Sequence, residues 1–131
     1  MNFEDYDNKQ SEKNNKIVAI DFDGVIHKSS RGFYDGTIYD DPIEGSIESI
    51  EYLRELGYEI VIYTCKANPD RPLIEGRCGV ELIWNWLQKY GIKQYISDVV
   101  WGKPWALIYI DDKGYRFENW EDTISFMEKL K

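Results

Sequence analysis

The stretch Ile17-Val18-Ala19-Ile20-Asp21-Phe22-Asp23-Gly24-Val25 decides how the rest of this sequence is interpreted. A run of β-favouring apolar residues ends at two carboxylates, Asp21 and Asp23, and a glycine follows at once. The pattern predicts a buried strand that delivers two acids to its carboxyl end, where ligands bind in open α/β sheets. An ordinary acidic turn after a strand has the same pattern, so the functional interpretation depends on partners elsewhere in the chain.

Length and composition indicate one globular domain. The chain has 131 residues, of which 43% are hydrophobic and 15% aromatic, which suits one core but not two domains. We expect residues 1–16 to be a disordered polar tail, neither signal peptide nor anchor, and residues 17–131 to form the domain. No apolar run approaches the length that a membrane span requires.

Charge and cysteine content narrow the possible partners. The formal net charge is −8, which disfavours binding to nucleic-acid phosphates and to anionic membranes but leaves room for a local basic pocket. Cys65 and Cys78 form no CxxC pair, and a chain without an export signal is expected to be cytoplasmic with reduced thiols. With His27 as the single histidine, a zinc site is poorly supported. We interpret His27 as a loop residue, with a general base as the less favoured alternative.

The segment after the first strand predicts a βαβ unit. Asp41-Pro42 has the pattern of a helix start, and apolar residues follow at helical spacing as far as Gly57. Residues 58–63 then form an apolar strand that ends at Thr64. Because the crossover in a βαβ unit makes its strands parallel, we expect Thr64 to lie near Asp21 at the same edge of the sheet.

Two connecting segments are candidates for contact with a ligand. Residues 28–41 contain Asp35-Gly36 between aromatic and β-branched residues, which predicts a tight hairpin that forms a small flap beside the acidic strand end. Residues 65–78 carry more basic than acidic side chains, and Lys66 is their first candidate for binding a substrate anion. The alternatives are a surface hairpin without a binding role and a solvated loop.

The second half of the chain repeats the pattern of helix and strand. We expect a helix from Gly79 to Tyr90 that ends at Gly91, and a short strand at Tyr95 and Ile96. A nearly unbroken apolar run within residues 102–112 then ends in Asp111 and Asp112, as expected for a strand covered on both faces. An amphipathic helix over residues 120–130 follows.

Four carboxylates are therefore expected at one edge of the sheet, those of Asp21, Asp23, Asp111 and Asp112. Two carboxylates about 4 Å apart repel by roughly 4 kcal/mol at an effective dielectric constant near 20, so the group requires a cation. Oxygen ligands of this kind suit Mg²⁺, which commonly binds a phosphate oxygen as well. Lys103 supplies a positive charge and Thr64 a hydroxyl donor, and both fit a phosphate group.

Four segments in this order resemble the motifs of the haloacid dehalogenase-like (HAD) superfamily. They are Ile17–Val25, Ile60–Thr64, Lys103-Pro104 and Ile108–Asp112. The resemblance covers nearly everything from residue 16 onward. It implies an α/β, Rossmann-like three-layer sandwich with a central parallel sheet, and Mg²⁺-dependent phosphoryl transfer through an aspartyl-phosphate. The chain has no room for a cap domain.

The resemblance also implies roles for individual residues. Asp21 would be the nucleophile and a metal ligand. Asp23 would protonate the leaving oxygen and then activate water, while its backbone carbonyl helps to hold the metal. Thr64 and Lys103 would bind the transferring phosphoryl group.

The remaining site residues complete this set. Asp111 and Asp112 would position Mg²⁺. Gly24 and Lys66 are placed with Thr64 and Lys103 at the substrate. Lys113 competes with Lys103 for the phosphate, but its loop position favours a role away from it. An acid at position 23 favours phosphate chemistry, because the dehalogenases of the family resemble a version that lacks it.

These observations predict a Mg²⁺-dependent phosphatase whose substrate is a phosphorylated small molecule or macromolecule end, with nucleic acid disfavoured by charge. Monomer and homo-oligomer both remain open. The alternatives are a phosphoacceptor signalling module of receiver type and a metal- and phosphate-binding HAD-like domain without turnover. In a receiver the lysine comes last, whereas here Lys103 precedes the final strand and its acidic pair, so motif order favours the hydrolase.

Overall fold

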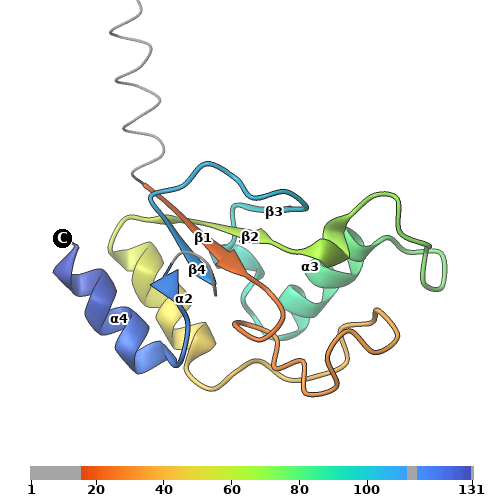
Figure 1. Ribbon diagram of the computed structural model, residues 1–131, viewed down its shortest axis with the longest axis horizontal. Coiled ribbons are helices and arrows are strands. Elements are labelled where there is room, and N and C mark those ends of the chain that lie inside the picture. The colour runs from red at the N-terminus through yellow and green to blue at the C-terminus, as the bar shows by residue number, and fades with distance from the viewer. Residues whose placement is uncertain (1–15, 112–114, 131) are drawn as a thin grey trace, which may run out of the picture.

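The computed structural model describes residues 16–111 and 115–130, which form an α/β, Rossmann-like sandwich around one parallel sheet (Figure 1). The sheet has five strands in the order β3-β2-β1-β4-β5, and all neighbouring strands are parallel. The strands are β1 Ile17–Asp21, β2 Glu59–Tyr63, β3 Asp98–Val100, β4 Ile108–Asp111 and β5 Tyr115–Arg116. The predicted α/β class with a central parallel sheet is confirmed, and the described residues contain no cap domain.

Three helices accompany the sheet: α2 Ser46–Glu55, α3 Gly79–Lys89 and α4 Trp120–Lys129. Two short 3-10 helices, η1 Cys65–Ala67 and η2 Lys93–Tyr95, follow β2 and α3. As predicted, α2 and α3 end just before Gly57 and Gly91. Each helix in the described part of the chain is too short or too polar to cross a lipid bilayer.

The hydrophobic core lies on one face of the sheet. Side chains alternate along a strand, so Val18 and Ile20 of β1 share a face, and both are fully buried. All three helices contribute to the same cluster, with Leu53 from α2, Leu87 from α3 and Met127 from α4. Each fully buried side chain of this size contributes roughly 1.5–3 kcal/mol, so this face fixes how the helices sit on the sheet.

On the opposite face, residues 101–107 link β3 to β4 without a helix. The rings of Tyr63 and Tyr109 pack edge to face there with their centroids 6.1 Å apart. Lys103 Nζ lies 4.6 Å from the centre of the Tyr109 ring. In the described residues, the layer on this face is thus a loop instead of a helix, and it carries Lys103 to the carboxyl edge of the sheet.

Helix α2 begins later than predicted. Asp41-Pro42 has the sequence pattern of a helix start, but Pro42 pairs with His27 in an antiparallel bridge. The chain turns toward the helix only at Gly45, whose φ of 85° lies in the left-handed region. The first helical residue is therefore Ser46, because the bridge holds Pro42 in an extended segment.

Residues 28–41, which we call the flap, form a series of turns instead of the predicted hairpin. The Asp35 carboxylate accepts the backbone N–H and the hydroxyl of Thr37 at 3.0 and 2.6 Å. Such local bonds compete with pairing across two strands. Antiparallel bonding is confined to the base of the flap, where the Lys28 N–H donates to the Asp41 carbonyl at 2.9 Å.

The short strand predicted around Tyr95 and Ile96 is present but lies further along the chain, as β3 Asp98–Val100. Tyr95 belongs to η2, and Ile96 is buried against the core. Pairing with β2 begins one residue further on, where the Ser97 N–H donates to the Ile60 carbonyl at 2.8 Å. The backbone of Ile96 is extended, with φ −102° and ψ 126°, but Ile96 directly follows η2, so the pairing with β2 starts only after it. The predictions for the tail, Asp112 and Lys113 lie outside the described residues, Lys16 excepted.

Candidate functional site

Four predicted residues line one open cavity of about 210 Å³ at the carboxyl edge of the sheet, namely Asp21, Thr64, Lys103 and Asp111. Asp21 ends β1, Thr64 follows β2 and Asp111 ends β4, so three adjacent parallel strands bring them together. This is the edge at which open α/β sheets bind ligands. Lys103 comes from the loop on the far side of the sheet from the core.

The register of the sheet makes Asp21 and Asp111 neighbours. Each follows directly after one member of the pair Ile20 and Ile110. The Phe22 N–H donates to Asp21 Oδ1 at 2.8 Å. Asp111 is 4% exposed, and Lys103 Nζ lies 3.2 Å from its Oδ2. The ammonium therefore offsets the negative charge of a buried carboxylate, and both carboxylates share one wall of the cavity.

Thr64 is held by the backbone around it. Its N–H donates to the Val100 carbonyl at 3.1 Å, and its Oγ1 accepts the Lys66 N–H at 3.2 Å. Thr64 is 4% exposed, so its hydroxyl is held in one position at the cavity wall. A hydroxyl that accepts one bond can still donate its own hydrogen to an anion.

A tight turn after β1 determines where Asp23 lies. The Phe22 carbonyl accepts the N–H groups of Val25, Ile26 and His27 at 3.3, 2.9 and 3.0 Å. Gly24 permits this turn with a φ of 83°, and its own N–H donates to the His27 carbonyl at 2.8 Å. The structure places Asp23 and Gly24 in this turn after β1, and neither is among the residues that line the cavity. The turn brings the His27 ring next to Asp23.

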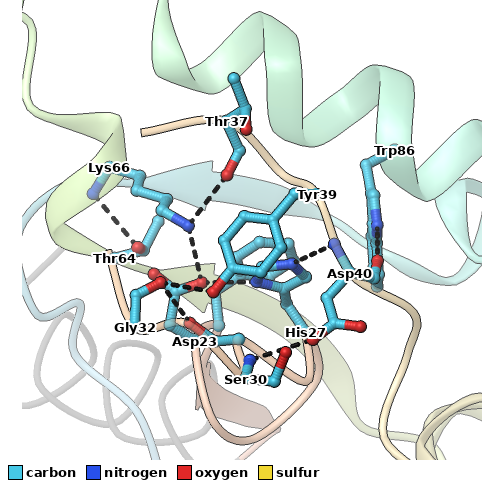
Figure 2. A network of polar contacts seen from close by, with 12 residues as sticks. Asp23, His27, Ser30, Gly32, Thr37, Tyr39, Asp40, Thr64, Lys66 and Trp86 are labelled. Atoms are coloured by element: carbon cyan, nitrogen blue, oxygen red, sulfur yellow. Dashed lines mark hydrogen bonds and ion pairs between the residues drawn. The ribbon is translucent and has the colours of Figure 1, made fainter. Parts of the chain in front are cut away.

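His27 lies in the predicted loop but is fully buried. Its Nδ1 is 2.8 Å from Asp23 Oδ1, and its Nε2 accepts the Asp40 N–H at 3.0 Å. Because an acceptor nitrogen carries no proton, this bond assigns the proton of the neutral ring to Nδ1. His27 therefore donates to Asp23 (Figure 2).

Lys66 reaches Asp23 from another element, η1. The residue is 2% exposed, and Nζ lies 3.0 Å from Asp23 Oδ1 and 3.4 Å from the Thr37 carbonyl of the flap (Figure 2). The structure thus brings the ammonium of Lys66 to Asp23, whereas Lys103 is the lysine that lines the cavity. Because the Lys66 side chain is buried while Asp23 is only partly exposed, removal of the Asp23 carboxylate would leave a buried ammonium uncompensated.

The environment of Asp23 favours its ionised form. Burial acts to raise the pKa of the Asp23 carboxyl, but hydrogen bonds from His27 and Lys66, together with the charge of Lys66, outweigh burial and hold the pKa below 3.8. Asp23 is accordingly an anion at neutral pH. At the edge of the flap, hydrogen bonds from Ser30 and the Asp41 N–H lower the pKa of Asp40 to about 2.

The cavity contains donors that fit Mg²⁺. Asp21 and Asp111 present hard carboxylate oxygens there, and Mg²⁺ commonly binds through one or two carboxylates plus water and phosphate oxygens. Within residues 16–111 and 115–130, no group of three or more His, Cys, Asp and Glu side chains could hold a metal by itself. A cation in this cavity would therefore keep open positions for water or a substrate oxygen.

Three further cavity residues escaped the sequence analysis: Tyr63, Cys65 and Trp101. Tyr63 and Cys65 flank Thr64 in the sequence, so their positions were available as a signal. Trp101 is 53% exposed, which is unusual for a large aromatic side chain and leaves its ring free to contact a ligand. Its nearness to Lys103 in the sequence is the only signal that pointed to it.

Comparison of the chain with models of known protein families found no match, and comparison with curated protein sequences found none.

Proposed function

We propose that this protein is a Mg²⁺-dependent phosphatase that hydrolyses phosphate monoesters through an aspartyl-phosphate on Asp21. The observation that carries the proposal is the shared cavity of Asp21, Thr64, Lys103 and Asp111. This set contains a nucleophile, a hydroxyl donor, a cation and a second carboxylate. The resemblance of the sequence motifs to the HAD superfamily agrees with this chemistry.

In the first step, a carboxylate oxygen of Asp21 attacks phosphorus and the bond between phosphorus and the leaving oxygen breaks. The leaving oxygen takes a proton from Asp23. Since Asp23 is ionised in the free protein, that proton arrives with a monoester bound as its monoanion, whose last proton has a pKa of about 6.

In the second step, water attacks the phosphorus of the aspartyl-phosphate. Asp23 accepts a proton from that water, the bond between phosphorus and Asp21 breaks, and inorganic phosphate leaves. Asp21 is then restored as a carboxylate, and Asp23 gives the accepted proton to the departing phosphate or to solvent and is ionised again. The same residue thus serves as acid and then as base, which splits one difficult displacement into two easier ones.

Thr64 and Lys103 provide electrostatic stabilisation. A hydroxyl and an ammonium at the cavity wall bind the equatorial phosphoryl oxygens, whose charge must be offset during transfer. Asp21 and Asp111 would hold Mg²⁺, together with Asp112, which the sequence predicts, and the Asp23 carbonyl, which the family resemblance implies. The ion would neutralise phosphoryl charge when it is bound.

The cavity is open, so a large leaving group can extend outward from the phosphate. A net charge of −8 disfavours nucleic acid. The exposed ring of Trp101 offers a flat surface to an aromatic leaving group. We therefore place aromatic phosphate esters first among candidate substrates.

The test is hydrolysis of p-nitrophenyl phosphate with Mg²⁺ by the wild type and by Asp21→Asn. We expect turnover that the variant loses while its fold is kept, because the change is nearly isosteric. Asp98→Asn makes the same substitution at the start of β3, away from the cavity, and should keep full activity. Full activity of Asp21→Asn would refute the nucleophile. Stoichiometric phosphorylation without turnover would indicate the phosphoacceptor module instead.

A further inference from the structure

We propose that His27 and Lys66 are positioning residues that hold Asp23 Oδ1 and thereby direct Oδ2 toward the leaving group and the attacking water. The inference rests on the proposed function, in which Asp23 exchanges protons with the substrate. It assigns a role to a histidine that the sequence indicated as a loop residue, with a general base as the less favoured alternative, and to a lysine that the sequence indicated as a substrate contact.

Both donors bind the same oxygen of Asp23. His27 Nδ1 lies 2.8 Å and Lys66 Nζ 3.0 Å from Oδ1. No hydrogen bond from residues 16–111 or 115–130 reaches Oδ2, and the Asp23 side chain is 29% exposed. Two donors on one oxygen fix the rotation of the carboxylate, so the proton-exchanging oxygen is selected before substrate binds.

His27 is itself held in place. Its ring stacks on Phe22 with centroids 5.4 Å apart and meets the edges of Trp86 and Tyr39 at 5.6 and 5.2 Å. The Asp40 N–H fixes the tautomer through Nε2. An imidazole that is packed on several sides and bonded at both nitrogens supports its partner in the way that orienting residues support metal ligands.

Lys66 links two functions of the site. Its backbone N–H donates to Thr64 Oγ1, the hydroxyl at the phosphate position, while its side chain reaches Asp23. Its Nζ also contacts the Thr37 carbonyl of the flap at 3.4 Å. One residue therefore sets the spacing between phosphoryl binding and proton transfer, with the flap as a third anchor.

A positioning role predicts a dependence on the leaving group that a structural role does not. p-Nitrophenolate is a good leaving group and departs readily without protonation. Phenolate is a poorer leaving group, since the pKa of phenol is about 10, so its departure depends more strongly on a proton from the enzyme. The ratio of kcat/KM for p-nitrophenyl phosphate to kcat/KM for phenyl phosphate therefore reports on proton delivery in the first step. The two esters differ little in shape, so binding contributes little to the ratio.

We would measure this ratio for the wild type, His27→Phe, His27→Asn and Lys66→Met. His27→Phe keeps the ring but loses the donor, whereas the amide of His27→Asn can donate from the position of Nδ1. We expect the ratio to rise about fivefold to tenfold in His27→Phe and Lys66→Met, which is a part of the ~10²–10⁴-fold that general acid–base catalysis contributes in full. In His27→Asn the ratio should return toward the wild-type value. Lys89→Met, an exposed lysine on α3, is the matched control.

Circular dichroism and the Tm of each variant identify any variant that fails to fold. If His27→Phe does not fold, the ratio measured for Lys66→Met provides the test. If kcat/KM falls by the same factor for both esters, so that the ratio is unchanged, the positioning role is refuted while the proposed phosphatase activity is not. A wild type that hydrolyses neither ester would refute the phosphatase and the positioning role together.

Discussion

Gly79 offers the sharpest test of how the site is supported, because Gly79→Ala adds a methyl group where no space exists. Gly79 is the first residue of α3 and packs against η1, the segment that carries Lys66. A Cβ at Gly79 would lie 1.6 Å from the Lys66 carbonyl oxygen and 2.7 Å from its carbonyl carbon. Both are backbone atoms, so no side-chain rotation relieves the contact.

The size of the effect follows from these distances. Ordinary contacts of a Cβ begin near 3.4 Å, so η1 and α3 must separate by about 2 Å. Overpacking of this kind costs about 1–3 kcal/mol and occasionally more, and the helix preference of alanine offsets at most about 1 kcal/mol. An approach of 1.6 Å to a backbone oxygen places the cost at or above the top of this range, about 3–4 kcal/mol. After the offset, we expect the free energy of unfolding to fall by about 2–3 kcal/mol and the Tm to fall by roughly 10 °C.

Thermal and urea unfolding of the wild type, Gly79→Ala and Gly102→Ala provide the assay. Gly102 is the matched control, since no heavy atom lies within 4 Å of its added Cβ, and its variant should stay within about 0.5 kcal/mol of the wild type. Because the shift displaces Lys66 from Asp23, phosphatase activity of Gly79→Ala should fall as well, even well below its Tm. Equal Tm values for the two variants would refute the tight packing of η1 on α3.

Other predictions concern the cavity and the flap. Chelation of divalent cations should abolish turnover and added Mg²⁺ restore it, whereas unaffected turnover in chelator would overturn the metal site. Lys103→Ala should weaken phosphate handling more than Lys113→Ala, because Lys103 lines the cavity 3.2 Å from Asp111; the reverse order in kcat/KM would exchange their roles. Trp101→Ala should raise KM for p-nitrophenyl phosphate about threefold to tenfold, while Trp105→Ala, at an exposed position that does not line the cavity, should not. The pKa of Asp40 is about 2 in the folded protein against an ordinary 3.8, so its carboxylate stabilises the flap above pH 4 and this contribution disappears as the pH falls through about 2. The Ser30 amide resonance should therefore change little between pH 7 and pH 3, and a midpoint near pH 4 would contradict the hydrogen bond.

The parallel sheet could be predicted because local patterns and the βαβ rule agree. The apolar run before Asp21 and the strand before Thr64 need no long-range information, and parallel pairing then brings both to one edge. Asp111 follows by the same reasoning. At these three positions, the residue at which the strand ends is enough to predict that the side chain lies at the carboxyl edge of the sheet.

Side-chain partnerships that depend on turns could not be predicted. The sequence around His27 does not reveal that three backbone N–H groups donate to the Phe22 carbonyl. The turn that these bonds form places the imidazole of His27 next to Asp23. The prediction of a hairpin in the flap was wrong for a related reason. The Asp35 carboxylate accepts hydrogen bonds from the N–H and hydroxyl of Thr37, two residues away, and these local bonds replace pairing between two strands. Likewise, a basic loop indicated Lys66 as an anion ligand, but burial turned its ammonium toward a carboxylate of the protein itself.

Cys65 gives the open cavity a practical consequence. Its thiol is exposed and its residue lines the cavity, so a maleimide or a disulfide adduct attached there would occupy the space that a phosphate ester needs. In preparations handled without reductant, a disulfide adduct at Cys65 would block the proposed turnover while the fold stays intact. Cys78 is also exposed but lies outside the cavity lining, so single-cysteine chains that keep one thiol or the other would supply a spectroscopic label inside the cavity and a matched label outside it.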